Sequence, residues 1–190
     1  MRLVFATTNP GKLKELSDLL GPSWLVKSAR DFPSVPEVEE TATTFEGNAE
    51  LKARALCAAT GLLAIGDDSG LCVDALDGRP GVYSARYAPT DAERHSKLLG
   101  ELAAVPAGPG RAAYFECALC AVWPDGRIER ARGRCEGSIA FVARGSQGFG
   151  YDPLFELPDG KTLAELGQTQ KAAVSHRGAA FRALVTKLSR

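Results

Sequence analysis

The fold class is decided by the stretch Leu62-Leu-Ala-Ile-Gly-Asp-Asp-Ser-Gly-Leu-Cys-Val73. Its first four residues are apolar, and Gly66-Asp-Asp-Ser-Gly70 has the composition of a polar turn, after which Leu71 and Val73 resume the apolar pattern. A short apolar run that is bounded by turn residues is typical of a strand in the interior of a sheet. The stretch therefore predicts a buried strand, Leu62 to Ile65, with two adjacent aspartates directly at its end.

Helices and strands alternate on the N-terminal side of this stretch. Residues 3–7 have the composition of a buried strand, 8–12 that of a tight turn, and 13–20 carry apolar residues at helical spacing. Thr43-Thr-Phe-Glu46 has the pattern of a capping box, which predicts a helix that runs to about Ala59 and stops at Gly61.

The C-terminal side is richer in strands. Thr90-Asp-Ala-Glu93 predicts a second capped helix, and residues 113–123, 127–132 and 135–142 are predicted to be successive strands. A last helix is expected to begin near Ser175. No linker or repeat interrupts the chain, so residues 1–190 are predicted to form a single mixed α/β domain.

Length and charge narrow the function classes. The chain has 190 residues, of which 45% are hydrophobic, a value typical of soluble globular proteins. Lys plus Arg and Asp plus Glu both number 23, whereas a nucleic-acid binder with a broad basic face would show a surplus of cations. We therefore expect a small-molecule ligand and no nucleic-acid partner.

The cysteines and the N-terminus bear on the cellular compartment. Five cysteines, an odd number, do not form a disulfide framework, and Cys117 and Cys120 lie three apart in a predicted strand, where they face opposite sides. No apolar stretch is long enough for a signal peptide or a membrane span. The expected location is the cytoplasm, without a membrane partner.

The first candidate for chemistry is the turn between the first strand and the first helix. It contains Thr7, Thr8, Asn9, Pro10, Gly11 and Lys12. Amides at a helix start attract anions and a lysine adds charge there, so the turn can bind phosphate; the spacing is not that of a Walker A loop. Asn-Pro-Gly is also ordinary turn chemistry.

The second candidate is the aspartate pair after the apolar strand. Asp67 and Asp68 would be costly to crowd together without a cation, and Mg²⁺ prefers such oxygen ligands. Glu39 and Glu40, in an acidic loop, could add carboxylates. The alternative is a polar turn in which Asp68 or Ser69 bonds its own backbone.

The third candidate is a face of the helix that begins after Thr44. Phe45, Asn48 and Lys52 share this face at spacings of three and seven residues. The face is either a solvated edge or a ligand-facing edge, and spacing does not choose between them.

The fourth candidate lies toward the C-terminus. Glycines flank Phe149 in Gly148-Phe-Gly-Tyr-Asp152, which would let a flat ligand approach the backbone and stack on the ring. His176 and Arg177 stand at a helix start, where donors can converge on an acceptor. His95 lies on an amphipathic helix without a neighbouring cluster, so it is assigned no role.

Several of these segments, taken in order, resemble the inosine/xanthosine triphosphate pyrophosphatase family. The resemblance is carried by Thr7-x-Asn9-x-x-Lys12, Thr44-Phe-x-x-Asn-Ala-x-x-Lys-Ala53, Asp67-Asp-Ser-Gly-Leu71, Pro80-Gly-Val-Tyr-Ser-Ala-Arg86, Gly148-Phe-Gly-Tyr-Asp-Pro153 and Ser175-His-Arg-Gly178. The departures are small: Thr8 stands where glycine is frequent, and Gly47 where an acidic residue often precedes the asparagine.

The resemblance implies a fold, an activity and an assembly. The fold would be a long central mixed sheet flanked by helices. The activity would be Mg²⁺-assisted hydrolysis of deaminated purine nucleotides, namely dITP, ITP and XTP, to the monophosphate and pyrophosphate. The assembly would be a homodimer.

The resemblance also implies roles for individual residues. Asp68 would be the general base and a metal ligand, with Glu39 or Glu40 as the second metal carboxylate. The substrate-binding set would be Thr7, Thr8, Asn9, Pro10, Gly11, Lys12, Lys52, Ser69, Phe149, Gly150, Tyr151, Asp152, Lys171, His176 and Arg177.

Two alternatives remain at this point. The chain could be a module that senses a purine triphosphate without cleaving it, although crowded carboxylates near phosphates would not benefit such a module. It could also be a related pyrophosphatase that acts on other nucleotides, such as modified pyrimidines.

Overall fold

The computed structural model describes residues 1–36 and 38–188. The chain divides into two compact units. Unit 1 comprises Met1–Asp68, Cys117–Gly133 and Arg177–Arg190, and unit 2 comprises Ser69–Glu116 and Arg134–His176. None of the helices in the described part of the chain is both long and apolar enough to cross a membrane.

The helices and strands follow one another as β1 (Arg2–Phe5), α1 (Pro10–Leu20), β2 (Leu25–Ser28), α2 (Phe45–Thr60), β3 (Leu63–Val73), α3 (Asp91–Glu101), β4 (Ala112–Val122), β5 (Ile128–Ile139), β6 (Phe155–Glu156), α4 (Gln168–Val174) and α5 (His176–Leu188). The strand order is β2-β1-β3-β4-β5-β6. β1 pairs in parallel with β2 and β3, whereas β5 and β6 are antiparallel. The prediction of an α/β fold with a mixed sheet is therefore confirmed.

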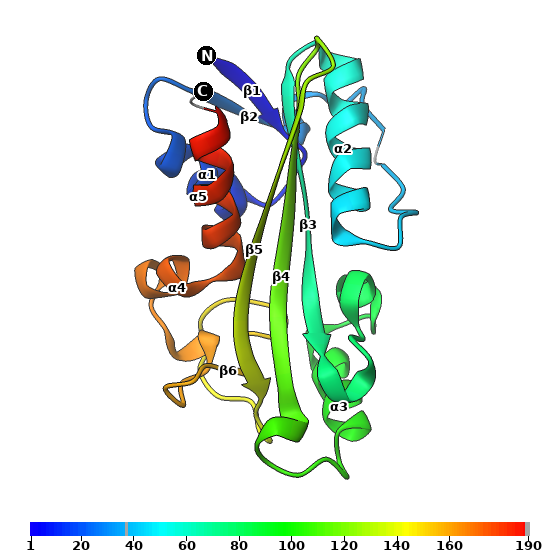
Figure 1. The fold of residues 1–190 in the computed structure, drawn as a ribbon, viewed down its shortest axis with the longest axis vertical. Helices are drawn as coiled ribbons and strands as arrows, with labels where there is room; N and C mark the ends of the chain where they lie inside the picture. The colour runs from blue at the N-terminus through cyan, green and yellow to red at the C-terminus, as the bar shows by residue number, and fades with distance from the viewer. Residues whose placement is uncertain (37, 189–190) are drawn as a thin grey trace. The chain divides into compact units, whose positions relative to one another are not determined.

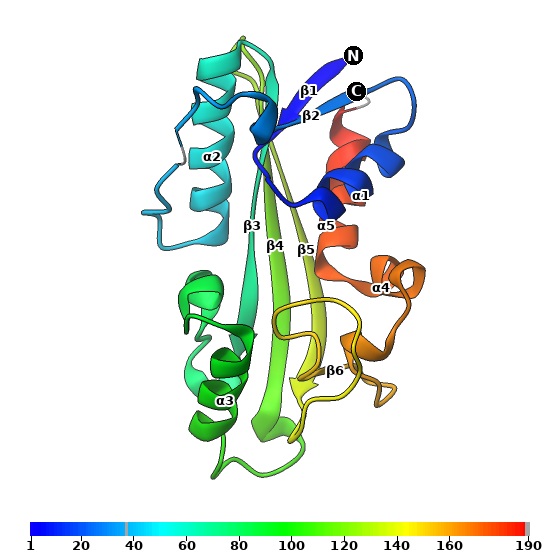
Figure 2. The same ribbon diagram turned by 180° about the vertical axis from the view of Figure 1, so that it is seen from behind.

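Unit 1 has helices on both sides of its strands. In Figures 1 and 2, α2 lies on one side of β1 and β3, and α1 and α5 lie on the other. The core on the α1 and α5 side contains the fully buried rings of Phe5 and Phe181, which meet edge to face at 5.7 Å. This packing fixes the end of β1, from which the loop to α1 departs.

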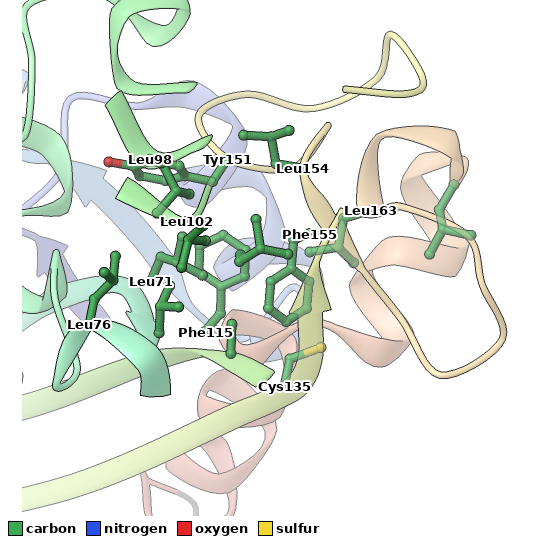
Figure 3. Packing of buried hydrophobic residues seen from close by; sticks show 14 residues of the cluster. Leu71, Leu76, Leu98, Leu102, Phe115, Cys135, Tyr151, Leu154, Phe155 and Leu163 are labelled. Carbon is green, nitrogen blue, oxygen red and sulfur yellow. The ribbon is translucent and has the colours of Figure 1, made fainter. Parts of the chain in front are cut away.

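Unit 2 has its own apolar core, shown in Figure 3. The rings of Phe115 and Phe155 pack 4.7 Å apart between centroids, and Leu98 of α3 and Leu154 are fully buried in the same cluster. The buried Tyr151 belongs to this core, so the segment that contains Phe149 is attached to it directly.

The predicted end of the strand at Ile65 is wrong, and the alternative of a polar turn after it does not form either. β3 is a single strand from Leu63 to Val73, so Asp67 and Asp68 lie inside it. Gly66 suggested a turn, but a Cβ there would lie 2.1 Å from the carbonyl oxygen of Ala49. The glycine instead allows α2 to approach the strand closely.

Other boundaries also differ from prediction. The two strands expected between residues 127 and 142 are the single strand β5, and α1 begins at Pro10 because Asn9 caps it. The N-cap of α2 is Thr44, which accepts from the amide of Gly47, so the expected box with Glu46 does not form. No periodic pattern predicted the three short elements β2, β6 and α4.

All five cysteines are buried and free. Burial raises the pKa of the Cys117 thiol to about 12 and those of Cys120 and Cys135 to about 11. Thiols with such values remain protonated near neutral pH and behave as small apolar groups. The prediction that they form no disulfide framework is confirmed.

Candidate active site

The loop before α1 is organised by its own side chains. Asn9 accepts hydrogen bonds from the amides of Gly11, at 2.8 Å, and Lys12, at 3.3 Å, and the hydroxyl of Thr7 accepts from the Asn9 amide at 3.1 Å. Pro10 occupies the first turn of the helix, where its missing N–H is not needed. The loop is thus held rigidly, with Lys12 at its end.

Lys12 pairs with the first of the two aspartates. Its ammonium lies 2.5 Å from Oδ2 of Asp67, whose side chain is only 3% exposed. Burial raises the pKa of this carboxyl, but the charges of Lys12, Arg177 and Lys52 outweigh that effect and hold the pKa below its ordinary value. Asp67 is therefore ionised and buried among cations.

Asp68 makes contact with α2. Asn48 is fully buried and donates from Nδ2 to Oδ2 of Asp68 at 2.9 Å, while its own Oδ1 accepts from the amide of Ala42. Since successive side chains of a strand alternate between faces, Asp67 meets α1 and Asp68 meets α2. The two adjacent carboxylates thus avoid each other by facing opposite ways.

Lys52 is the cation on the Asp68 side. Its Nζ lies 2.6 Å from Oε1 of Glu40 and 3.9 Å from Oδ1 of Asp68, and it donates to the carbonyl oxygen of Asp67 at 2.8 Å. Two carboxylates from distant parts of the sequence therefore converge on one positive charge. Glu40 is half-buried and shares Lys52 with Asp68, whereas Glu39 is exposed.

This donor set is compatible with a magnesium ion. Mg²⁺ in phosphate-handling sites is commonly held by one or two carboxylates together with substrate phosphates and water. Asp68 and Glu40 already face a shared cation, the Lys52 ammonium, and could hold Mg²⁺ in this way. No larger cluster of acidic, His or Cys side chains suited to a metal occurs in residues 1–36 and 38–188.

A cavity of about 390 Å³ lies next to these groups within unit 1. Thr7, Thr8, Glu40 and Lys52 line it, together with apolar side chains that include Phe32 and Leu56. The cavity extends from the loop before α1 to Lys52 of α2 and to Glu40. Part of the predicted phosphate-binding turn, Thr7 and Thr8, therefore lines the same cavity as Glu40 of the acidic loop.

Unit 2 holds the glycine-flanked aromatic in a fixed loop. Oδ2 of Asp152, which is buried, accepts from the amide of Phe149 at 2.8 Å and from the ammonium of Lys171 at 2.5 Å. Gly148 has φ +82°, and a Cβ there would lie 2.2 Å from this same oxygen. Lys171 also lies 5.0 Å from the centroid of the Phe149 ring.

Tyr151 of this loop contacts Ser84, which belongs to the motif at residues 80–86. Tyr151 donates from its hydroxyl to the carbonyl oxygen of Ser84 at 3.0 Å, and Ser84 accepts from the amide of Leu71 at 2.9 Å. Residues 81–86, a short 3₁₀ helix, thereby link the Tyr151 side chain to Leu71 of β3. In this structure the motif therefore holds Tyr151 and Leu71 in place through Ser84.

Three further predicted residues, Ser69, His176 and Arg177, lie where the chain passes from one unit to the other. Ser69 is half-buried and directly follows Asp68. His176 and Arg177 are both buried. The His176 ring stacks on Phe115 at 4.7 Å between centroids in unit 2, whereas the Arg177 charge acts on Asp67 in unit 1.

Two residues were missed or underrated in the sequence. Asn48 was one of three on a helix face that could equally have been solvated, and its link to Asp68 was not predicted. His95 was assigned no role, yet its Nε2 lies 2.7 Å from the carbonyl oxygen of Gly150. No spacing signal connects positions 55 residues apart, so only the fold reveals this contact.

Comparisons with known proteins agree with the motifs. A family model described as the Ham1 family matches residues 3–187. A "dITP/XTP pyrophosphatase" of an Exiguobacterium species is 49% identical, covering 99% of this chain and 97% of its own, and one from a Synechococcus species is 51% identical, covering 99% and 90%.

Solved structures give the same result. A HAM1 protein from Coxiella burnetii has a TM-score of 0.93 and 42% identity and covers 100% of this chain and 98% of its own. A "Nucleoside-triphosphatase / dITP/XTP pyrophosphatase" from Mycobacterium abscessus has a TM-score of 0.82 and 44% identity, with coverage of 99% and 100%. The resemblance stated from the motifs is confirmed.

Proposed function

Because the chain belongs to the Ham1 family, we propose that it is a nucleoside triphosphate pyrophosphohydrolase that converts dITP, XTP and ITP to the monophosphate and pyrophosphate. The observation that carries the proposal is the convergence of Lys52, Glu40 and Asp68 beside a cavity that also reaches the loop before α1. The names of the relatives support the substrate class.

Charge balance supports a triphosphate ligand. A triphosphate carries up to about four negative charges, and a chain of zero formal net charge must meet them with a few placed cations. Lys12 and Lys52 in unit 1, and Lys171 in unit 2, are half-buried lysines whose ammonium groups are held by carboxylates. An incoming phosphate would accept from the same ammonium groups while they stay close to their carboxylates.

Asp68 is proposed as the general base. Asn48 donates to Oδ2 of Asp68, and Oδ1, which lies 3.9 Å from the Lys52 ammonium, is proposed to take a proton from the water that attacks the α-phosphorus. Bound Mg²⁺, held by Asp68 and Glu40, would offset phosphate charge and acidify water. Lys12 and Lys52 would stabilise the pyrophosphate as it leaves, so the protein mainly positions groups and balances charge.

The nucleotide end of the substrate is assigned to unit 2 and the start of α5. Phe149, a residue that is 54% exposed, is proposed to stack on the base, with Lys171 and Asp152 fixing its loop. His176 and Arg177 are proposed to read the 6-oxo group. The homodimer and the cytoplasmic location remain predictions.

A substrate panel tests the proposal. Purified protein with Mg²⁺ should release pyrophosphate from ITP, dITP and XTP with a kcat/KM well above that for ATP and GTP. The pyrophosphate is measured with and without added inorganic pyrophosphatase, which distinguishes it from phosphate. Tight binding without release would favour a sensing module instead, and a preference for modified pyrimidine triphosphates would favour the related pyrophosphatases.

Arg177→Ala tests how the base is read. Arginine has only donors, so it suits the 6-oxo group of hypoxanthine and opposes the 6-amino group of adenine. We expect the variant to lower kcat/KM for ITP more than for ATP and to compress their ratio by about 5- to 150-fold, as expected for one buried polar mismatch. Equal losses on both substrates would show that Arg177 serves the Asp67 carboxylate instead.

A further inference from the structure

Both backbone polar groups of Gly150 are held by one helix. The Gly150 amide donates to Oδ2 of Asp91 at 3.1 Å, and its carbonyl oxygen lies 2.7 Å from Nε2 of His95. Since a carbonyl oxygen only accepts, the ring nitrogen that faces it must carry the hydrogen. Asp91 and His95 lie one turn apart on α3, and both contacts fall within unit 2.

The helix that makes these contacts is itself firmly anchored. Thr90 and Glu93 form a capping box at its start, and Arg94 pairs with Asp91 at 2.7 Å and donates to the carbonyl oxygen of Ala85. Leu98, one turn further along, is fully buried in the core of unit 2. A contact with the first turns of α3 is therefore a contact with a fixed part of the fold.

Phe149 lies between two such attachments. Its own amide donates to Asp152, and the next residue, Gly150, is held by α3. The following residue, Tyr151, is buried, and its ring lies 6.2 Å from that of His95. The backbone on both sides of Phe149 is thus fixed, although the residue as a whole is more than half exposed.

We infer that Asp91 and His95 are positioning residues, which hold Gly150 so that the exposed ring of Phe149 is presented in one direction to the base of the nucleotide. The inference rests on the proposed function, in which Phe149 stacks on that base. An aromatic ring on a free loop would lose much of its stacking energy to the cost of ordering the loop on binding. Because the contacts with α3 already order the loop in the free protein, this cost does not arise when the nucleotide binds.

The first test separates binding of the base from handling of the phosphates. His95→Phe keeps a ring but loses the donor, His95→Gln retains a donor, and the exposed neighbour Ser96→Ala is the matched control. Inosine monophosphate binding, measured by calorimetry, should weaken about 2- to 10-fold in His95→Phe, the range for one lost hydrogen bond, and recover in His95→Gln. Binding of inorganic tripolyphosphate, which has no base, should not change.

Kinetics supply the readout that a merely structural role would not give. In His95→Phe the KM for ITP should rise by the same factor while kcat remains within about twofold, because the chemistry belongs to unit 1. Unchanged monophosphate affinity in His95→Phe would overturn the inference. Equal weakening of both probes, or a fall in kcat with an unchanged KM, would overturn it as well.

A second measurement does not depend on the activity. Hydrogen exchange at the Gly150 amide should accelerate in Asp91→Ala and remain slow in Asp91→Asn, whose side-chain oxygen still accepts. If wild-type protein neither hydrolyses ITP nor binds inosine monophosphate, the proposed function fails. Exchange would then still report whether α3 holds the loop, and equal protection in wild type and Asp91→Ala would refute that hold separately.

Discussion

Replacing Asp68 with asparagine is expected to abolish hydrolysis of ITP while leaving the nucleotide bound. An amide takes no proton from water and is a poorer ligand for Mg²⁺, whereas it has nearly the shape of the carboxylate. General-base catalysis alone is worth about 10²–10⁴-fold in rate, so kcat should fall by at least that factor. Initial rates at saturating ITP and Mg²⁺ measure the loss.

The control for this variant is an aspartate away from the site. Asp74→Asn, an exposed position just after β3, should retain the wild-type rate and the wild-type thermal unfolding temperature. Asp68→Asn should unfold close to wild type, because the new amide can still accept from Asn48. A variant that kept more than about a tenth of the rate would show that another group is the base.

Replacing Lys12 with methionine is expected to lower the free energy of unfolding by several kcal/mol. Lys12→Met leaves the buried carboxylate of Asp67 without its closest cation, and breaking a buried ion pair from one side costs about 3–5 kcal/mol. We expect the lower end of this range, because Lys12 is 20% exposed. Lys14→Met is the matched control, since the Lys14–Asp18 pair is exposed and its loss should cost less than about 1 kcal/mol.

The loss of unfolding free energy in Lys12→Met should become smaller as the pH falls. The pKa of Asp67 is lowered in the folded protein, so its ionisation contributes stability above the ordinary carboxyl pKa that is lost as the pH falls. Without Lys12 the folded pKa rises, because burial is then opposed only by Arg177 and Lys52. Urea unfolding should therefore show the deficit of Lys12→Met narrowing from about pH 7 to about pH 4.

A double variant isolates the charge. Lys12→Met combined with Asp67→Asn should recover part of the stability, since no uncompensated carboxylate is left buried. If the double variant were no more stable than Lys12→Met, the loss would have to come from packing.

The same single variant should also affect activity. Lys12→Met should lower kcat/KM for ITP and ATP equally, by about 10- to 150-fold, because it removes one charge-assisted contact to phosphate.

The sequence was informative wherever a local pattern determined the structure. The capping box of Thr90 and Glu93 formed as predicted, because it depends only on neighbours in the sequence, and α5 begins close to where it was expected. The prediction ended the apolar strand at Ile65, and glycine and aspartate, which follow there, normally disfavour strands. In the fold, the close approach of α2 and pairing with lysines override that preference.

The candidate site was predicted as separate segments and not as an arrangement. Motifs identified the lysines, carboxylates and aromatic loop, but not the partner of each. That Lys12 meets Asp67 while Lys52 meets Asp68 and Glu40 depends on which face of β3 each side chain takes. The contact of His95 with Gly150 depends on tertiary packing alone, so no sequence period could predict it.

The position of bond cleavage tests the central claim most directly. ITP should be hydrolysed in ¹⁸O-water with Mg²⁺, and the products followed by phosphorus NMR. If water attacks the α-phosphorus, the only phosphorus products are inosine monophosphate and pyrophosphate, and the ¹⁸O appears in the monophosphate. Release of inorganic phosphate with inosine diphosphate, or ¹⁸O in the pyrophosphate, would contradict the account.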